Sequence, residues 1–175
     1  MPGSAKRKGS PTSAPATPPV KASKADASNE EVPEAASPSG GTLLGASDAA
    51  AAKRTIPAAI AAMAHAACKH SGYRVGACLL SESGKAYSGC NVESDSYGLT
   101  VCAERVALFK ALSEGERSFT HLSCATANGG IACGACRQML SEYCPQTMET
   151  LFVNAAGEVT RRTTVGEMLP DPFVL

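Results

Sequence analysis

Two short segments, residues 100–105 (TVCAER) and residues 132–137 (ACGACR), determine how this chain folds and what chemistry it can carry. Each segment lies at the start of a predicted helix. A Cys-x-x-Cys pair at a helix start places both sulfurs on one turn, where each can lie about 2.3 Å from a shared metal ion. The positive end of a helix also lowers thiol pKa values and favours the thiolate that a metal requires. Cys102, Cys133 and Cys136 are therefore candidate zinc ligands that leave a fourth position for water.

Glu104 is the candidate general acid and base. It lies two residues after Cys102, so on a helix its side chain turns away from the direction of the sulfur. It can stand beside the open position and carry a proton without binding the metal. One such carboxylate can take a proton from water at the open position and deliver protons to the reacting substrate. The helix dipoles and Arg105 are candidates for offsetting the negative charge of three thiolates.

Other interpretations of the same residues remain open at this point. A Cys-x-x-Cys pair alone also occurs in redox sites and in structural zinc sites. Cys124 or Cys144 could supply a fourth thiolate and close a non-catalytic zinc module within an interaction scaffold. Glu104 could be a first-turn acid that the helix dipole favours. The two segments together, with a glutamate at the matching offset, favour the catalytic interpretation.

The segments around the two motifs predict an α/β fold. Thr55 is a candidate N-cap, with Pro57 in the first turn of the helix that follows. Hydrophobic patterns and turn residues predict helices over residues 55–69, 101–113 and 133–143, a short helix between Thr164 and Pro170, and strands over residues 73–80, 85–92, 121–127, 150–153 and 159–163. This order gives a mixed sheet covered by helices.

Composition divides the chain into two parts. Residues 1–46 contain no aromatic residue and most of the prolines, so we predict a disordered tail followed by a catalytic domain over residues 47–175. The Lys6-Arg7-Lys8 cluster in that tail is typical of solvated charge. Basic and acidic residues are equal in number, which disfavours polynucleotides and anionic membranes as partners. Without a signal peptide or a long apolar run, the chain is expected to be a soluble cytoplasmic protein.

The spacing of the motifs resembles that of the zinc-dependent cytidine deaminases, most closely the small homotetrameric type of the cytidine/deoxycytidylate deaminase superfamily. Cys102-x-Glu104 is followed, 31 residues after Cys102, by Cys133-x-x-Cys136. Further motifs in the order of this family are residues 75–77 (VGA), 89–93 (GCNVE), 102–105 (CAER), 133–138 (CGACRQ) and 168–173 (MLPDPF). The resemblance implies a three-layer α-β-α fold with a mixed five-stranded sheet. It also implies a Zn²⁺ cofactor, pyrimidine salvage as the role, and a homotetramer with shared active sites.

The resemblance also implies a role for each site residue. Zinc would be held by Cys102, Cys133 and Cys136, with Arg105 hydrogen-bonded to the sulfurs and Glu104 moving protons. For the substrate, it implies ribose contacts from Asn91 and Glu93, a backbone contact to the pyrimidine edge from Ala103, base packing by Tyr73, and stacking by Phe173 in a neighbouring subunit's site. Asn91 and Glu93 are two residues apart, so they share one face of a strand.

The chain departs from the family pattern at three positions. Tyr73 stands where a phenylalanine is usual, Arg74 where a proline is common, and Ala132 where a proline usually precedes the cysteine. These changes bear on substrate detail and leave the metal ligands in place. The TVCAE segment is shared with blasticidin S deaminases, a sister group. A nucleotide, an antibiotic nucleoside or RNA is the alternative substrate, and the neutral composition disfavours RNA. Asn91 before Glu93 and the Arg137-Gln138 pair favour cytidine and deoxycytidine.

Overall fold

The structure is a computed structural model that describes residues 46–175, with side chains from residue 48 onward. Its elements are α1 (Ala46–Met63), β1 (Val75–Ser81), β2 (Ala86–Cys90), the 3₁₀ turn η1 (Tyr97–Leu99), α2 (Ala103–Ser113), β3 (Phe119–Thr126), α3 (Gly134–Tyr143), β4 (Glu149–Val153), β5 (Val159–Thr164) and α4 (Val165–Met168). Apart from Ala46, the predicted tail of residues 1–46, with Lys6-Arg7-Lys8, lies outside the described range. None of the helices described is long and apolar enough to cross a bilayer.

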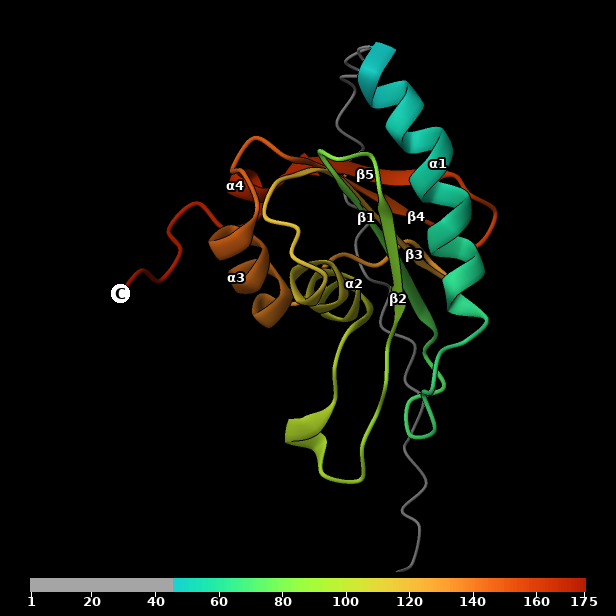
Figure 1. Cartoon of the computed structure of the whole chain (residues 1–175). Coiled ribbons are helices and arrows are strands. Elements are labelled where there is room, and N and C mark those ends of the chain that lie inside the picture. Colours follow the sequence, from blue (N-terminus) through green and yellow to red (C-terminus); the bar gives the residue numbers. More distant parts are fainter. Residues whose placement is uncertain (1–45) are drawn as a thin grey trace, which may run out of the picture. The chain divides into compact units, whose positions relative to one another are not determined.

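The five strands form one mixed sheet in the order β2-β1-β3-β4-β5. Strands β3 and β4 are parallel and every other neighbouring pair is antiparallel. The strands predicted over residues 73–80 and 85–92 pair as the antiparallel β1-β2 hairpin, with Gly76 opposite Cys90 and Leu80 opposite Ala86. Helix α1 covers one face, and α2 and α3 lie on the other (Figure 1). The predicted three-layer α/β fold with a five-stranded mixed sheet is confirmed.

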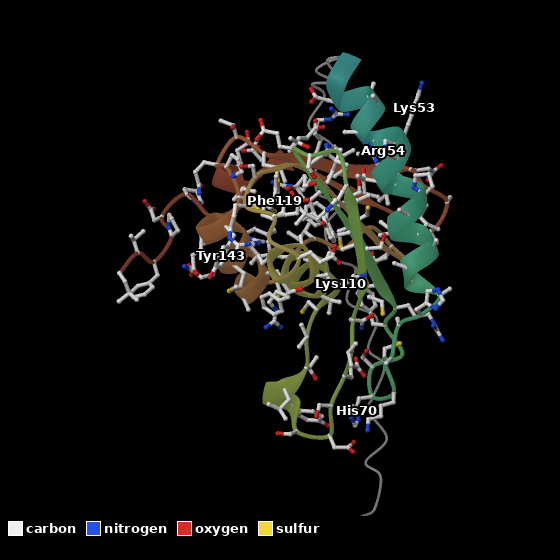
Figure 2. All side chains as sticks on the ribbon, in the orientation of Figure 1. Lys53, Arg54, His70, Lys110, Phe119 and Tyr143 are labelled. Carbon is white, nitrogen blue, oxygen red and sulfur yellow. The ribbon has the colours of Figure 1, made fainter. Side chains whose placement is uncertain are left out.

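Helix α1 differs from its prediction at both ends. It spans Ala46–Met63 rather than residues 55–69, so Pro57 lies inside the helix and Thr55 is not an N-cap. Pro57 is on the exposed face, where water can bond the backbone carbonyl that loses its N–H partner. The Thr55 hydroxyl is buried, donates to the Ala51 carbonyl at 2.9 Å and pairs with the Ser123 hydroxyl at 2.7 Å. Lys53 points away from the sheet (Figure 2), whereas the Arg54 side chain donates to the Gly84 carbonyl in the β1-β2 turn at 2.7 Å.

Gly89 on β2 lets α2 approach the sheet closely. A Cβ at this position would lie 2.6 Å from the Ala107 nitrogen and 2.7 Å from the Ala103 oxygen, both in the backbone of α2. Backbone atoms cannot move aside as the end of a flexible side chain can. The absence of a side chain at Gly89 therefore fixes how deep the N-terminus of α2 sits.

We expect Gly89→Ala to destabilise the fold by about 3 kcal/mol, because α2 has to shift as a whole. Urea unfolding measures this loss. Gly98→Ala is the steric control, because a Cβ at Gly98 meets nothing within 4 Å and neither Gly89 nor Gly98 has a positive φ. A Gly89→Ala protein as stable as the unaltered chain would show that α2 is not held this tightly.

A buried polar group lies on the sheet face that α1 covers. His121 is almost fully buried and its Nε2 lies 3.4 Å from the Ser123 hydroxyl. Its Nδ1 lies 3.4 Å from a Glu149 oxygen, but that carboxylate is already paired with Arg162 at 2.6 Å. Burial lowers the pKa of His121 from 6.5 to about 4, with Asp48 acting to raise it and Arg162 to lower it. The ring is therefore neutral in the folded protein at neutral pH.

Stability should fall as the pH drops from 7 to 5, because only the unfolded chain then protonates His121. The unfolded histidine binds its proton near pH 6.5 and the folded one only near pH 4, so the loss falls in that window. Linkage gives a loss of about 2 kcal/mol between pH 7 and pH 5. Urea unfolding of the chain and of His121→Gln at both pH values measures the loss, which the variant should largely lack. An equal pH dependence in both proteins would contradict this assignment.

Candidate active site

Three thiols converge where α2 and α3 begin. Cys102 caps the N-terminus of α2, Cys133 caps that of α3, and Cys136 lies in the first turn of α3. The Cys133 sulfur lies 3.8 Å from that of Cys102 and 3.5 Å from that of Cys136, and all three lie within 4.8 Å of one another. Two Zn–S bonds of about 2.3 Å at a tetrahedral angle separate their sulfurs by about 3.8 Å. The three thiols therefore fit a tetrahedral zinc ion.

The charges around the thiols favour metal binding. Hydrogen bonding from Cys136, and then from Arg105, lowers the pKa of the Cys102 thiol to about 5. The pKa of Cys136 is raised by its hydrogen bond to Cys102 and by burial. Arg105 Nη2 lies 3.7 Å from the Cys102 sulfur and donates to the Thr100 carbonyl at 3.1 Å. The Cys102 thiol is therefore readily ionised for metal binding, and the neighbouring Arg105 guanidinium offsets the charge of its thiolate.

Glu104 lies beside the thiols in the first turn of α2, and only 4% of its surface is exposed. Burial raises the pKa of its carboxyl group to about 7. A carboxyl group with a pKa near neutrality can both accept and donate a proton at physiological pH. Its position and its burial therefore suit a group that moves protons.

A cavity of about 290 Å³ opens onto these groups. Its lining consists of Ser71, Tyr73, Val75, Asn91, Glu93, Thr100, Cys102, Glu104, Cys124, Thr126, Gly130, Ile131 and Cys133. These lining residues combine two carboxylates and one amide with thiol, hydroxyl and apolar groups, and none of them is lysine, arginine or histidine. It therefore suits a small, uncharged, polar ligand.

The predicted substrate residues have different positions. Asn91 and Glu93 line the cavity. The Asn91 side-chain oxygen accepts from the Val75 nitrogen and its side-chain nitrogen donates to the Tyr73 carbonyl, each at 2.9 Å. Ala103 is buried as the first residue of α2. All three residues are placed where they could contact a substrate in the cavity. Their roles in substrate binding stay predictions.

Phe173 does not line this cavity. Its side chain is 68% exposed and borders a separate cavity at the end of the chain, with Ser141 and Glu142. Its backbone is held by the Gln138 side chain through bonds of 2.9 and 3.2 Å. A role for Phe173 therefore depends on a neighbouring subunit.

Sequence reasoning missed several residues around the cavity. Ser71 bonds the Glu93 carboxylate, and Asn128 accepts from the Tyr73 hydroxyl at 2.7 Å. The Thr126 hydroxyl accepts from the Gly130 nitrogen at 2.7 Å. No periodic pattern marks these positions, because the partners of Ser71 and Tyr73 come from distant segments and the Thr126–Gly130 bond lies in an irregular loop.

The departures from the family pattern have structural explanations. Arg74 donates to carbonyls at the end of α1, of Ala64 at 3.2 Å and of Met63 at 3.4 Å, and its charge suits a helix C-terminus. Ala132 is buried, and its carbonyl accepts from Arg137 Nε at 2.8 Å. The loop into α3 is therefore held without a proline.

Comparison with known proteins decides the family. The model of the cytidine and deoxycytidylate deaminase zinc-binding region matches residues 50–152. The chain belongs to this family. It is 45% identical over 106 residues to a cytidine deaminase of Sporosarcina psychrophila, covering 59% of this chain and 77% of that protein. It is 42% identical over 120 residues to one of Halalkalibacterium halodurans, covering 67% and 90%.

A solved structure agrees with the sequence relatives. The crystal structure of a cytidine deaminase from Burkholderia pseudomallei is 46% identical, with a TM-score of 0.64 over 67% of this chain and 95% of that one. The predicted family, the zinc cofactor and the enzyme class, a hydrolytic deaminase, are confirmed. Neither Cys124 nor Cys144 belongs to the thiol cluster among the described residues, so the four-cysteine module is not supported.

Proposed function

We propose that the protein converts cytidine and deoxycytidine into uridine and deoxyuridine, with water consumed and ammonia released. The observation that carries this proposal is the group of three sulfurs at zinc spacing beside the buried Glu104, at a cavity that Asn91 and Glu93 also line. Each element of the reaction has a group to serve it: a metal site, a proton carrier and polar contacts for a sugar.

Cys102, Cys133 and Cys136 would hold the zinc ion, which when bound would supply Lewis acidity that lowers the pKa of water. Glu104 accepts a proton from water on a carboxylate oxygen while the water oxygen bonds to C4 of the cytosine ring. Glu104 then passes that proton to N3. It takes the remaining proton of the new hydroxyl and delivers it to the 4-amino group, which leaves as ammonia as the C4 carbonyl forms. Arg105 offsets the thiolate charge throughout.

The test is ammonia release from cytidine by the purified full-length chain loaded with zinc. Uridine should form in equal amount, and a strong chelator followed by buffer exchange should abolish turnover until zinc is restored. A substrate panel that includes blasticidin S tests whether the protein prefers this alternative substrate to cytidine. Faster turnover of blasticidin S than of cytidine would overturn the choice of substrate, and no ammonia from either would overturn the proposed function.

The cavity should discriminate against phosphorylated substrates. A phosphate placed beside Glu93, with no basic group in the lining, is desolvated without a partner. We expect kcat/KM for dCMP to be at least about 100-fold lower than for deoxycytidine, which corresponds to about 2.7 kcal/mol. Steady-state kinetics on this pair measures the ratio, since the two differ only in the phosphate. Comparable values would place a basic group of another subunit at the site.

We further infer that the working unit is a homotetramer in which Phe173 reaches a neighbouring active site. The side chains of Val92, Leu99 and Phe109 are exposed in the single chain. Exposed apolar side chains support an assembly, because contact with another subunit would bury them. Light scattering of the purified protein measures the mass of the assembly and so tests for a tetramer.

The eight free thiols suit a reducing compartment such as the cytoplasm, where the product would enter pyrimidine salvage.

A further inference from the structure

The carboxylate of Glu93 accepts hydrogen bonds from the turn at His70 and Ser71, more than 20 residues earlier in the chain. One oxygen accepts from the backbone N–H of His70 at 2.7 Å and from that of Ser71 at 3.1 Å. The other oxygen accepts from the Ser71 hydroxyl. Three donors from two consecutive residues therefore fix the plane of this carboxylate.

The turn is itself held in shape by local contacts. Gly72 has a φ of +66°, a left-handed conformation that glycine adopts without strain. The Ser71 hydroxyl accepts from the Tyr73 nitrogen at 2.9 Å, which directs its proton towards Glu93. The turn is thus built to present Ser71 to this carboxylate.

The ring of His70 anchors the turn to the loop that follows Glu93. Its Nε2 lies 3.2 Å from an Asp95 oxygen, and the ring meets the edge of Tyr97 at a centroid distance of 5.4 Å. Figure 2 shows His70 beside this projecting loop, away from the body of the sheet. The turn that contains His70 therefore contacts both Glu93 itself and the loop that follows Glu93.

We propose that Ser71 is a positioning residue for sugar recognition, which holds Glu93 at the cavity so that its carboxylate accepts hydrogen bonds from the ribose hydroxyls. This inference rests on the proposed function, since it specifies how that same site reads the nucleoside. Ser71 and Glu93 both line the cavity that contains Glu104. Glu104 is buried beside the thiols, so Glu93 is the carboxylate available to the sugar end of a bound nucleoside.

The hydrogen bonds suit Glu93 to this task in two ways. Those from Ser71 and then from His70 lower the pKa of the carboxyl group, so it stays ionised and can only accept. An ionised carboxylate offers about four lone-pair sites, and three donors leave room for a hydroxyl. A carboxylate that is already oriented also loses less freedom when substrate binds.

The test replaces Ser71 with alanine in the zinc-loaded full-length protein. KM for cytidine should rise about tenfold, the cost of one hydrogen bond to a charged group, while kcat changes by less than about twofold. KM for 2′,3′-dideoxycytidine, which lacks the 2′- and 3′-hydroxyls, should not change. Ser71→Thr keeps the hydroxyl and should restore the KM for cytidine.

Ser83→Ala is the matched control, because Ser83 donates to Glu116 at 2.8 Å in the same kind of bond away from the cavity. It should change neither KM. Calorimetric binding of uridine and 2′,3′-dideoxyuridine gives a readout without turnover, and Ser71→Ala should weaken only uridine binding. Equal effects on both ligands, or none on either, would overturn the positioning role. Failure of the unaltered protein to deaminate cytidine would instead overturn the proposed function.

Discussion

Replacing Glu104 with glutamine is expected to lower kcat for cytidine by at least about a thousandfold while one zinc ion per chain is retained. Glutamine has the same shape but cannot carry the proton from water to N3 and then to the amine. Glu104 is buried and its carboxyl pKa is raised to about 7, so the ionised form is the costly one in this position. The neutral amide should therefore leave the melting temperature unchanged or higher.

Glu114→Gln is the matched control, because it makes the same substitution at an exposed position, at the C-terminal end of α2. Its kcat, zinc content and melting temperature should equal those of the unaltered chain. Steady-state ammonia release, metal analysis and thermal unfolding measure the three quantities. Normal turnover by Glu104→Gln would remove this carboxylate from the mechanism, and loss of zinc would assign it to the metal shell.

Local sequence patterns were sufficient for most of the fold. Contacts within a few residues determine the two strands of the β1-β2 hairpin, helix α2 and the short helix α4 that follows Thr164, and all of these were predicted. The two cysteine motifs were readable for the same reason, because each places its ligands on one helix start.

Features that depend on tertiary contacts were not readable. Helix α1 begins nine residues before its predicted start, because the alanine-rich sequence has no clear boundary and an exposed proline is tolerated inside it. Thr55 resembled an N-cap, yet its partner is Ser123 on a distant strand. The grip of Ser71 on Glu93 has the same origin, since two loops meet only after the sheet has formed. Local propensity fixes elements, whereas such pairings depend on the packed structure.

Replacing Cys136 with serine is expected to reduce the zinc content from about one ion per chain to a small fraction, and to reduce cytidine turnover by at least about a thousandfold. The Cys136 sulfur is buried between α2 and α3, and serine offers a harder, weakly acidic oxygen in place of a thiolate. Metal analysis after dialysis against a weak chelator measures the first effect independently of activity.

Cys144→Ser makes the same change at another buried thiol, at the opposite end of α3. The three sulfurs of Cys102, Cys133 and Cys136 already lie at tetrahedral spacing, so this control should keep its zinc and its activity. Zinc loss in Cys144→Ser would mean that a fourth cysteine closes the coordination shell, leaving no place for water. Because a catalytic zinc needs that open place, the comparison of these two serine variants separates an enzyme from a structural module by metal content alone.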